Sequence, residues 1–430
     1  MEVNKKIYKI VFVVCSFCTT VTFGQSVYSI TLETALRTEL FSSYSTQQRP
    51  NKQVLVYADL TLLTVNDMNI KDQTLSVSAQ LGLSWLDERL KWDTGRTQDY
   101  SSINYMFSTE RYTWKPTIYV ENSVEDLSVI TDLNTPMRMN QKGLIEWSTS
   151  AIYMVSCEAV ITYYPLDQQI CDIKLSTTGY TSLQINLLLK ANPVDLLFYS
   201  ENGEWELLAV TGTKPDDRVK GSVSHSKVTF SIHLQRRPMF HVLNTMFPVV
   251  LMAFLIPMAF KLHVESGEKI GYCLTVLLAY AVYLSMISEN IPSTSVSICY
   301  LSIYLASTLV LSTLSVLFVI LVINVHHTPD DEPMSDRLKS VALKMEKCIC
   351  RRKRNESATQ PVKVAPATEE LPKGKKHGAF LESCDPEEEE MTWVRLSRLL
   401  DRFFFLSFMI IISASTIIFI FLISFQMITS

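Results

Sequence analysis

The alternation of apolar and polar side chains divides this sequence into a β-rich half followed by an apolar helical half. Over residues 25–235, short segments such as LTLLTV, LSVSAQLGLSW and VTFSIHL alternate with period two and are separated by turn residues. This pattern is typical of strands with one buried face. We therefore predict an all-β, immunoglobulin-like sandwich. Before it, SVYSITLETALRTELFSS has apolar residues at helical spacing and predicts a helix.

Four long apolar runs follow the β-rich half. Three follow one another closely, at residues 240–260, 270–287 and 296–325, and the fourth covers residues 403–429. Each is long enough to cross a hydrocarbon core of about 30 Å at about 1.5 Å per residue. The pattern therefore predicts an all-α domain of four transmembrane helices.

Charge and the first residues predict the orientation. Residues 1–24 carry lysines, then a short apolar run and small residues, which is typical of a signal peptide, although a short membrane helix is the alternative. The linker between the third and fourth spans is rich in Lys and Arg, whereas ENIPSTS, between the second and third, has neither. Positive charge favours the cytoplasmic side. We expect a multi-pass plasma-membrane protein with the β-rich domain and both mature termini outside the cell.

These features give the expected domains: signal peptide 1–24, extracellular ligand-binding domain 25–237, membrane helices one to three 238–327, cytoplasmic linker 328–390, and a helix leading into the fourth span 391–430. In the linker, an amphipathic helix capped by Ser335 is suited to anionic membrane lipid. Residues 356–390 are rich in Pro, Lys and Glu and predict disorder. Cys348 and Cys350 are either acylated or free thiols.

Composition excludes several classes of function. The net charge of −4 is too small to indicate a nucleic-acid partner. The β-rich half has no metal-spaced His or Cys set and no Ser-His-Asp context, so we expect neither an enzyme nor a metal or cofactor site. In that half only Cys157 and Cys171 remain after signal removal. A disulfide between these two cysteines would stabilise the fold by about 3 kcal/mol. One interpretation of the pair is therefore an ordinary disulfide that stabilises the sandwich.

Polar residues in the second apolar run are periodic. Steps of three and four place on one helical face Glu268, Gly271, Thr275, Leu278, Val282, Ser285 and Glu289. The opposite face carries Cys273, Leu277, Tyr280 and Leu284. Carboxylates and hydroxyls in lipid would cost several kcal/mol, so the stripe must face water or partner helices. One interpretation is a pore with acidic rings at both mouths and an apolar constriction between them. The alternative is a stripe buried between helices of one subunit.

Several stretches together resemble a known family. CEAVITYYPLDQQIC, QRRPMFHVLNTMFPVVLMAF, VESGEKIGYCLTVLLAYAVYLSMISENIPSTS and VLFVILVINVHH look like the Cys-loop pentameric ligand-gated ion channels, in particular the nicotinic acetylcholine receptor branch. The resemblance implies a disulfide between Cys157 and Cys171, and a pore lined by the second span in a ring with four further like subunits. SGEK at the start of that span resembles the cation-selective members, which implies permeation by Na⁺ and K⁺. The sequence leaves permeation by Ca²⁺ open.

The resemblance also implies residues that transmit ligand binding to the pore. The coupling loop would be formed by Tyr164, Pro165, Leu166 and Asp167. Its electrostatic partner would be Arg236, and the linker on which it pushes would contain Pro292, Ser293 and Thr294. Asn69 and Ile70 stand where cationic members usually carry acids, which predicts weaker or different coupling.

The agonist site departs further from the family pattern. The family binds quaternary ammonium ligands in an aromatic cage. Here Glu121, Thr178 and Gln80 occupy aromatic positions of that cage, and TGTKPDDRVKGSVSHSK lacks the adjacent cysteines and flanking tyrosines. An acetylcholine site is therefore not expected. Residues left around the pocket are Tyr119, Glu121, Thr178, Tyr180 and His225, facing a neighbour's Gln80, Arg138 and Glu146. A carboxylate at Glu121 could still hold a cation.

Three hypotheses follow. The favoured one is a cation-selective channel opened by a small-molecule agonist other than acetylcholine, similar to divergent invertebrate chemosensory receptors. The second is an auxiliary subunit of a heteromeric channel, in which the pocket residues are only solvated. The third, a membrane-attached binding protein or enzyme, leaves the polar stripe unexplained. The sequence does not decide the agonist, homomeric or heteromeric assembly, or calcium permeability.

Overall fold

The computed structural model describes residues 29–220, 223–289, 291–292, 297–329, 332–345 and 392–429, without the side chains of residues 218–220, 223 and 426–429. The predictions for residues 1–24 and 356–390, and those for Ser293, Thr294, Cys348 and Cys350, lie outside this part of the chain. Contacts divide the chain into two compact units. One comprises Met1–Ala159 and Gln168–Gln235, and the other comprises Val160–Asp167 and Arg236–Ser430.

The first unit contains two β-sheets. A six-stranded sheet has the order β3-β5-β6-β2-β1-β8. Its strands are β1 (Val54–Asn69), β2 (Thr74–Leu86), β3 (Tyr105–Ser108), β5 (Met137–Asn140), β6 (Leu144–Ser156) and β8 (Ile185–Asp195). A four-stranded sheet has the order β4-β7-β12-β9. Its strands are β4 (Ile118–Val120), β7 (Gln168–Thr177), β9 (Trp205–Thr213) and β12 (Lys227–Arg236). The predicted β-sandwich is confirmed.

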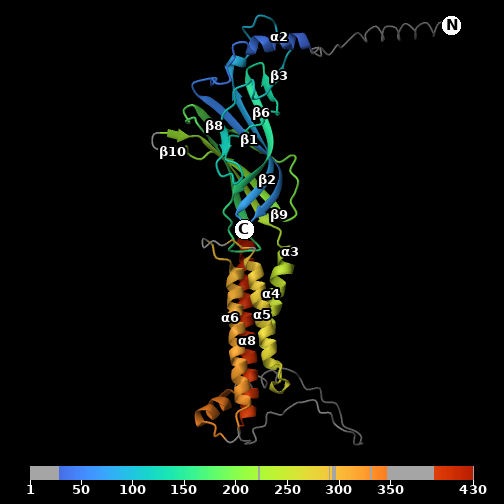
Figure 1. Cartoon of the computed structure of the whole chain (residues 1–430), viewed down its shortest axis with the longest axis vertical. Helices are drawn as coiled ribbons and strands as arrows, with labels where there is room; N and C mark the ends of the chain where they lie inside the picture. Colours follow the sequence, from blue (N-terminus) through green and yellow to red (C-terminus); the bar gives the residue numbers. More distant parts are fainter. Residues whose placement is uncertain are drawn as a thin grey trace, which may run out of the picture. The chain divides into compact units, whose positions relative to one another are not determined.

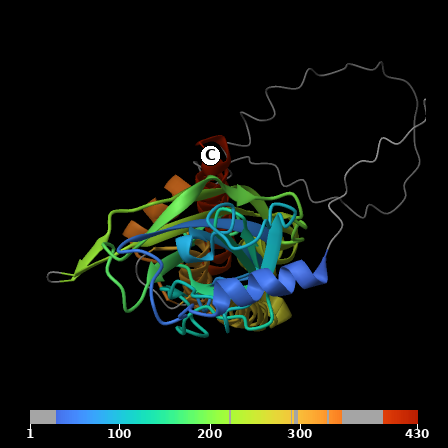
Figure 2. The same ribbon diagram turned by 90° about the horizontal axis from the view of Figure 1, so that it is seen from above.

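Period-two burial explains why these segments form strands. Buried residues alternate with more exposed ones in the first half of β1, in β2 as far as Leu81 and in β12 from Phe230 onward. Large side chains including Trp85, Trp147, Trp205 and Phe230 fill the interior. A two-stranded hairpin of β10 (Arg218–Lys220) and β11 (Val223–His225) extends away from the sheets (Figure 2).

The helix predicted before the strands is confirmed as α2 (Ile30–Phe41), which lies across one end of the β unit (Figure 1). The Ser29 hydroxyl caps it by accepting the amide of Leu32 at 3.4 Å. Leu36 and Leu40 are buried, four residues apart on one face.

The second unit contains four helices long and apolar enough to cross a membrane in the part of the chain that the structure describes: Met239–Lys261, Lys269–Ser288, Tyr300–His326 and Trp393–Phe425. They run side by side in Figure 1. The last three correspond to α5 (Lys269–Ser288), α6 (Tyr300–His326) and α8 (Trp393–Thr429). The four predicted spans are confirmed, and the helix predicted to lead into the last span is continuous with it in α8.

The first span departs from a regular α-helix. It consists of α3 (Met239–His241), a π-helical turn η2 (Val242–Met246), α4 (Phe247–Met258) and a 3₁₀ turn η3 (Ala259–Lys261). Pro248 follows the π-helical turn and Pro257 lies inside α4. Since proline has no amide hydrogen, each removes one helical hydrogen bond. Periodicity alone predicted the span but not this irregularity.

The amphipathic helix predicted after Ser335 is present at residues 336–345. The Lys339 amide donates to the Ser335 carbonyl at 3.1 Å. Ala342 packs with Met334 and Leu396, so the helix contacts the start of α8. Its contact with lipid stays a prediction.

Candidate functional site

The predicted stripe on α5 is exposed along its whole length. Every member from Glu268 to Glu289 lies on the surface of this chain. Leu278 is 65% exposed and Val282 62% exposed, whereas Cys273 and Tyr280 on the opposite face are 3% and 0% exposed. The alternative of a stripe buried between helices of one subunit is therefore wrong. The exposed face is also broader than predicted, because it includes Leu274, Ala281 and Met286.

Acidic side chains flank this exposed face. Glu268 is the N-cap residue of α5 and makes no side-chain capping bond there, while Glu289 is the C-cap residue. Lys269, next to Glu268, is instead buried: its side chain is 1% exposed and its ammonium group contacts the Asp401 carboxylate of α8. Because Asp401 neutralises Lys269 inside the helical unit, the negative charge of Glu268 dominates the exposed start of α5.

The predicted coupling residues of the loop at 160–167 belong to the helical unit. Arg236 Nε donates to Asp167 Oδ1 at 2.8 Å, and the two side chains are 3% and 1% exposed. The Arg236 guanidinium also lies 5.3 Å from the centre of the Tyr164 ring. Tyr164 Oη lies 3.1 Å from His241 Nδ1. The structure thus brings together Asp167, Arg236 and Tyr164 from sequence positions about 70 apart.

The loop also reaches the start of α6. The Tyr300 amide donates to the Thr162 carbonyl at 3.1 Å, and the Tyr163 and Tyr300 rings meet edge to face at 5.4 Å. Further along the same loop, Pro165 is buried and Leu166 is half-buried. Pro292 is buried, but contact of the loop with its linker stays a prediction.

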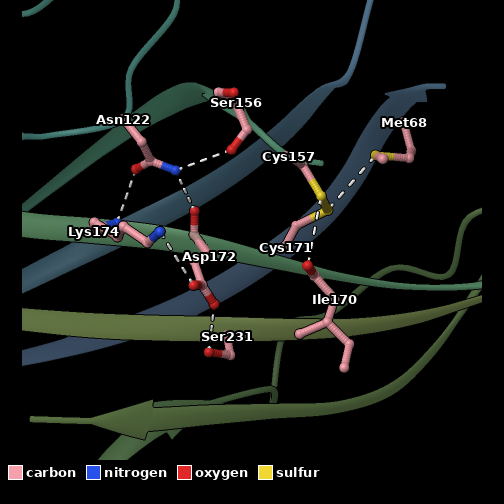
Figure 3. Close-up of a disulfide and its surroundings, with 9 residues drawn as sticks. All are labelled: Met68, Asn122, Ser156, Cys157, Ile170, Cys171, Asp172, Lys174 and Ser231. Atoms are coloured by element: carbon pink, nitrogen blue, oxygen red, sulfur yellow. Dashed lines mark hydrogen bonds and ion pairs between the residues drawn. A yellow bond between two sulfur atoms is a disulfide. The ribbon is translucent and has the colours of Figure 1, made fainter. Parts of the chain in front are cut away.

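The predicted disulfide between Cys157 and Cys171 is confirmed, with a Cα–Cα separation of 5.1 Å (Figure 3). Asn122 reinforces the junction beside it. Its side-chain amide donates to the carbonyls of Ser156 and Asp172, and its side-chain oxygen accepts the Lys174 amide. These bonds hold the end of β6 against β7 within the β unit.

The first group of predicted pocket residues lies on and beside the four-stranded sheet. Glu121 accepts a salt bridge from Lys227 Nζ at 2.9 Å, and both side chains are 17% exposed. His225 Nδ1 lies 3.1 Å from the Tyr180 carbonyl oxygen, so these two residues are adjacent. Thr178 is exposed, and Tyr119 on β4 is half-buried. The charge of Glu121 is already balanced by Lys227, which weighs against its use as an unpaired anion for a cationic ligand.

The second group lies on one face of the six-stranded sheet. Arg138 and Glu146 are directly opposed on β5 and β6, and Arg138 Nε donates to Glu146 Oε2 at 2.9 Å. This bond raises the pKa of Arg138 above its ordinary value. Gln80 pairs with Ser150 further along β6. The two groups would form one pocket only across neighbouring subunits, so their meeting stays a prediction.

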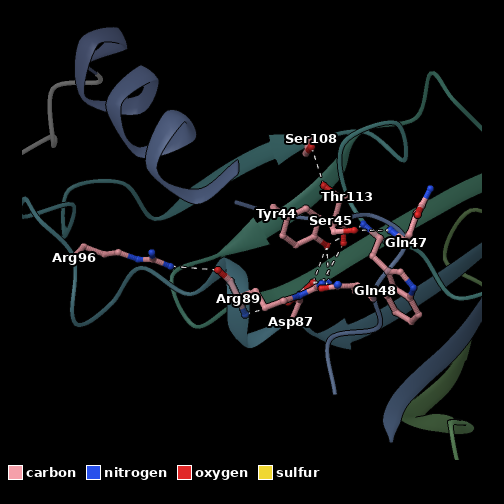
Figure 4. Close-up of polar contacts among 10 residues, drawn as sticks. Tyr44, Ser45, Gln47, Gln48, Asp87, Arg89, Arg96, Ser108 and Thr113 are labelled. Carbon is pink, nitrogen blue, oxygen red and sulfur yellow. Dashed lines mark hydrogen bonds and ion pairs between the residues drawn. The ribbon is translucent and has the colours of Figure 1, made fainter. Parts of the chain in front are cut away.

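Sequence reasoning missed a buried ion pair in the β unit (Figure 4). Asp87 has a fully buried carboxylate that accepts Arg89 Nε at 2.9 Å, Arg89 Nη2 at 2.7 Å and Tyr44 Oη at 2.8 Å. Burial and the adjacent Asp87 charge raise the pKa of Tyr44. The only sequence signal was an acid two positions before an arginine in WLDERLKW, which does not identify Tyr44 as the partner.

Comparisons with known proteins agree with this arrangement. Residues 33–238 match the family model described as neurotransmitter-gated ion-channel ligand binding domain, and residues 245–383 match the one described as neurotransmitter-gated ion-channel transmembrane region.

The chain is 32% identical over 317 residues to the neuronal acetylcholine receptor subunit alpha-4 of Gallus gallus, a match covering 72% of this chain and 50% of that protein. It is 30% identical over 335 residues to the alpha-6 subunit of Homo sapiens, covering 76% and 67%. It is also 30% identical over 321 residues to the acetylcholine receptor subunit delta of Xenopus laevis, covering 70% and 61%. The chain thus spans about half the length of the first of these relatives.

Proposed function

Because this chain belongs to the neurotransmitter-gated ion-channel family, we propose that it is one of five like subunits of a cation-selective, ligand-gated channel in the plasma membrane. The pore is lined by the exposed face of α5. The observation that carries this proposal is the pattern of exposure on α5, with polar and apolar stripe residues outward and an exposed acid at each end.

The charge at the start of α5 supports selectivity for cations. Five copies of Glu268 form an acidic ring at one mouth, and a ring of carboxylates concentrates cations and repels anions. Lys269 would oppose this effect if it pointed the same way, but its ammonium group is buried against Asp401. Halfway along the helix, Leu278 and Val282 form apolar rings that stop conduction by dewetting when the pore is narrow.

The agonist is a small molecule other than acetylcholine. Glu121, Thr178 and Gln80 replace aromatic side chains, so the cation–π contacts of a quaternary ammonium cage are absent at those positions. Glu121 is paired with Lys227, and Arg138 with Glu146. Each pair is neutral, so these residues leave no unbalanced charge for a ligand in the cleft. A chemosensory ligand of low net charge fits this cleft.

An auxiliary role is the second candidate function. The same two internal ion pairs favour it, since pocket residues that satisfy one another need no ligand. Expression of this chain alone separates the two: a ligand-evoked current from the homomer contradicts the auxiliary role.

Charge reversal at the acidic ring tests the proposed channel. Glu268→Lys places five cations at one mouth and is expected to reduce or abolish cation selectivity, seen as a shift of the reversal potential when external NaCl is diluted. Glu206→Lys, an exposed site on β9, is the matched control and should leave the reversal potential unchanged. If both variants keep the original reversal potential, Glu268 does not border the pore.

A further inference from the structure

Three tyrosines of α5 donate hydrogen bonds to backbone carbonyls of the first span. Tyr283 Oη donates to Asn244 O at 3.0 Å and to Thr245 O at 2.9 Å. Tyr280 Oη donates to Val249 O at 2.9 Å, and Tyr272 Oη to Leu255 O at 3.0 Å. These bonds follow the first span from its π-helical turn to the end of α4. The side of α5 that carries the tyrosines is therefore attached to backbone atoms of the first span at three points between Tyr272 and Tyr283.

The Tyr283 bond meets a specific need of the first span. In an α-helix the carbonyl of Asn244 would accept the amide four residues later, but that residue is Pro248, which has no amide hydrogen. The π-helical turn Val242–Met246 coincides with this gap. A carbonyl without a donor is costly in lipid, where water cannot replace the missing bond. The Tyr283 hydroxyl provides a donor from another helix, its one proton shared between this carbonyl and that of Thr245.

The remaining groups around the turn are consistent with this interpretation. The side-chain amide of Asn244 donates to the Phe240 carbonyl at 3.0 Å, so side chains complete the hydrogen bonding where the backbone pattern is irregular. π-Helical turns of this kind occur often at functional sites. Here the turn lies opposite Tyr283. In the sequence Tyr283 directly follows Val282, whose side chain is exposed.

We propose that Tyr283 is a positioning residue for the pore helix: its hydroxyl supplies the donor that Pro248 lacks, and so holds α5 in the rotation that turns Leu278 and Val282 outward. The bond itself does not depend on the proposed channel function, whereas its effect on ion flow does. A pore helix that rotates or tilts on opening changes its distance to Asn244, so the bond has different strength in the two states.

A double-mutant cycle on the full-length protein tests the bond. Tyr283→Phe removes only the hydroxyl, and Pro248→Ala returns an amide hydrogen beside Asn244. In detergent-purified protein, Tyr283→Phe is expected to lower the thermal midpoint, and Pro248→Ala should make most of this shift disappear. Tyr304→Phe is the matched control, because its hydroxyl bonds to Thr416 between α6 and α8 at 2.9 Å. Its shift should be the same with Pro248 or Ala at position 248. If the Tyr283→Phe shift is also the same with Pro248 and with Ala at position 248, the hydroxyl does not replace the amide that Pro248 lacks.

Unitary currents test the positioning role. In a Leu278→Thr background, recorded without added ligand, Tyr283→Phe is expected to change the open probability by about threefold per subunit, the factor implied by an average interhelical hydrogen bond in a membrane protein. Tyr304→Phe should leave it unchanged. If the background conducts and Tyr283→Phe has no effect on open probability, the positioning role is wrong. If neither the wild-type protein nor the Leu278→Thr variant conducts at any voltage, the channel proposal fails. The thermal cycle still decides whether the Tyr283 hydrogen bond contributes to stability.

Discussion

Arg236→Gln is expected to destabilise the helical unit strongly, because it leaves the Asp167 carboxylate buried without its guanidinium. Arg236 and Asp167 are joined by bonds of 2.8 Å and 3.4 Å and are 3% and 1% exposed. For two charges about 4 Å apart at an effective dielectric constant of about 20, the attraction is about 4 kcal/mol. Loss of one partner of a buried pair typically costs about 3–5 kcal/mol, so the two approaches agree.

Removal of both charges is expected to be milder than removal of either one. In the Arg236→Gln, Asp167→Asn double variant no ion is left buried, and two amides can hydrogen-bond to each other. Replacement of a whole buried ion pair is often close to neutral. We therefore predict that the double variant recovers most of the stability lost in Arg236→Gln.

The measurement is the thermal midpoint of the full-length protein in detergent, together with the amount that reaches the cell surface. A loss of about 3–5 kcal/mol should lower the midpoint by roughly 10 °C. Arg138→Gln is the matched control, since its ion pair with Glu146 is 50% and 35% exposed and contributes at most about 1 kcal/mol. Equal shifts for the two arginine variants, or a double variant no better than Arg236→Gln, would refute the reasoning.

Three further predictions address other parts of the chain. Leu278→Thr should wet the apolar constriction and raise the current without ligand, and an unaltered resting current would argue against a gate at this position. Tyr44→Phe removes a donor from a buried carboxylate and should cost about 1–3 kcal/mol in thermal or denaturant unfolding, whereas Tyr112→Phe, at a 59% exposed side chain, should be neutral. A hydrogen bond from Thr97 lowers the pKa of Glu39, so this contact stabilises α2 at neutral pH and is lost as the pH falls through the lowered pKa. Hydrogen exchange, with the intrinsic amide rate at each pH divided out, should then show lower protection of α2 at acid pH, and unchanged protection would contradict the assignment.

Local periodicity was sufficient to predict the elements, but not their contacts. Strands and spans were predicted because apolar and polar residues alternate in segments such as LTLLTV and because four apolar runs are long enough to cross a membrane. The partner of Lys269 is Asp401, 132 positions away, and the partner of Glu121, just after β4, is Lys227 on β12. Such pairs depend on which helices and strands become neighbours, and the sequence pattern of one element carries no information on that. The bond from Tyr283 to Asn244 was missed for the same reason.

These distant pairs change the interpretation of the charges that the sequence displays. In the β unit, Glu121 looks like a free anion in the sequence, yet Lys227 balances it. In α5 the reverse holds: Lys269 looks like a cation that would weaken the acidic ring at Glu268, yet Asp401 removes it from the exposed face. The two pairs thus remove apparent charges of opposite sign from the two units. They leave the proposed pore mouth more negative, and the proposed ligand cleft closer to neutral, than a count of charged residues indicates. Cation selectivity and a ligand without strong positive charge are then compatible in one chain, because the two properties depend on charges in separate units. Packing within each unit decides which of its charges are balanced and which stay exposed.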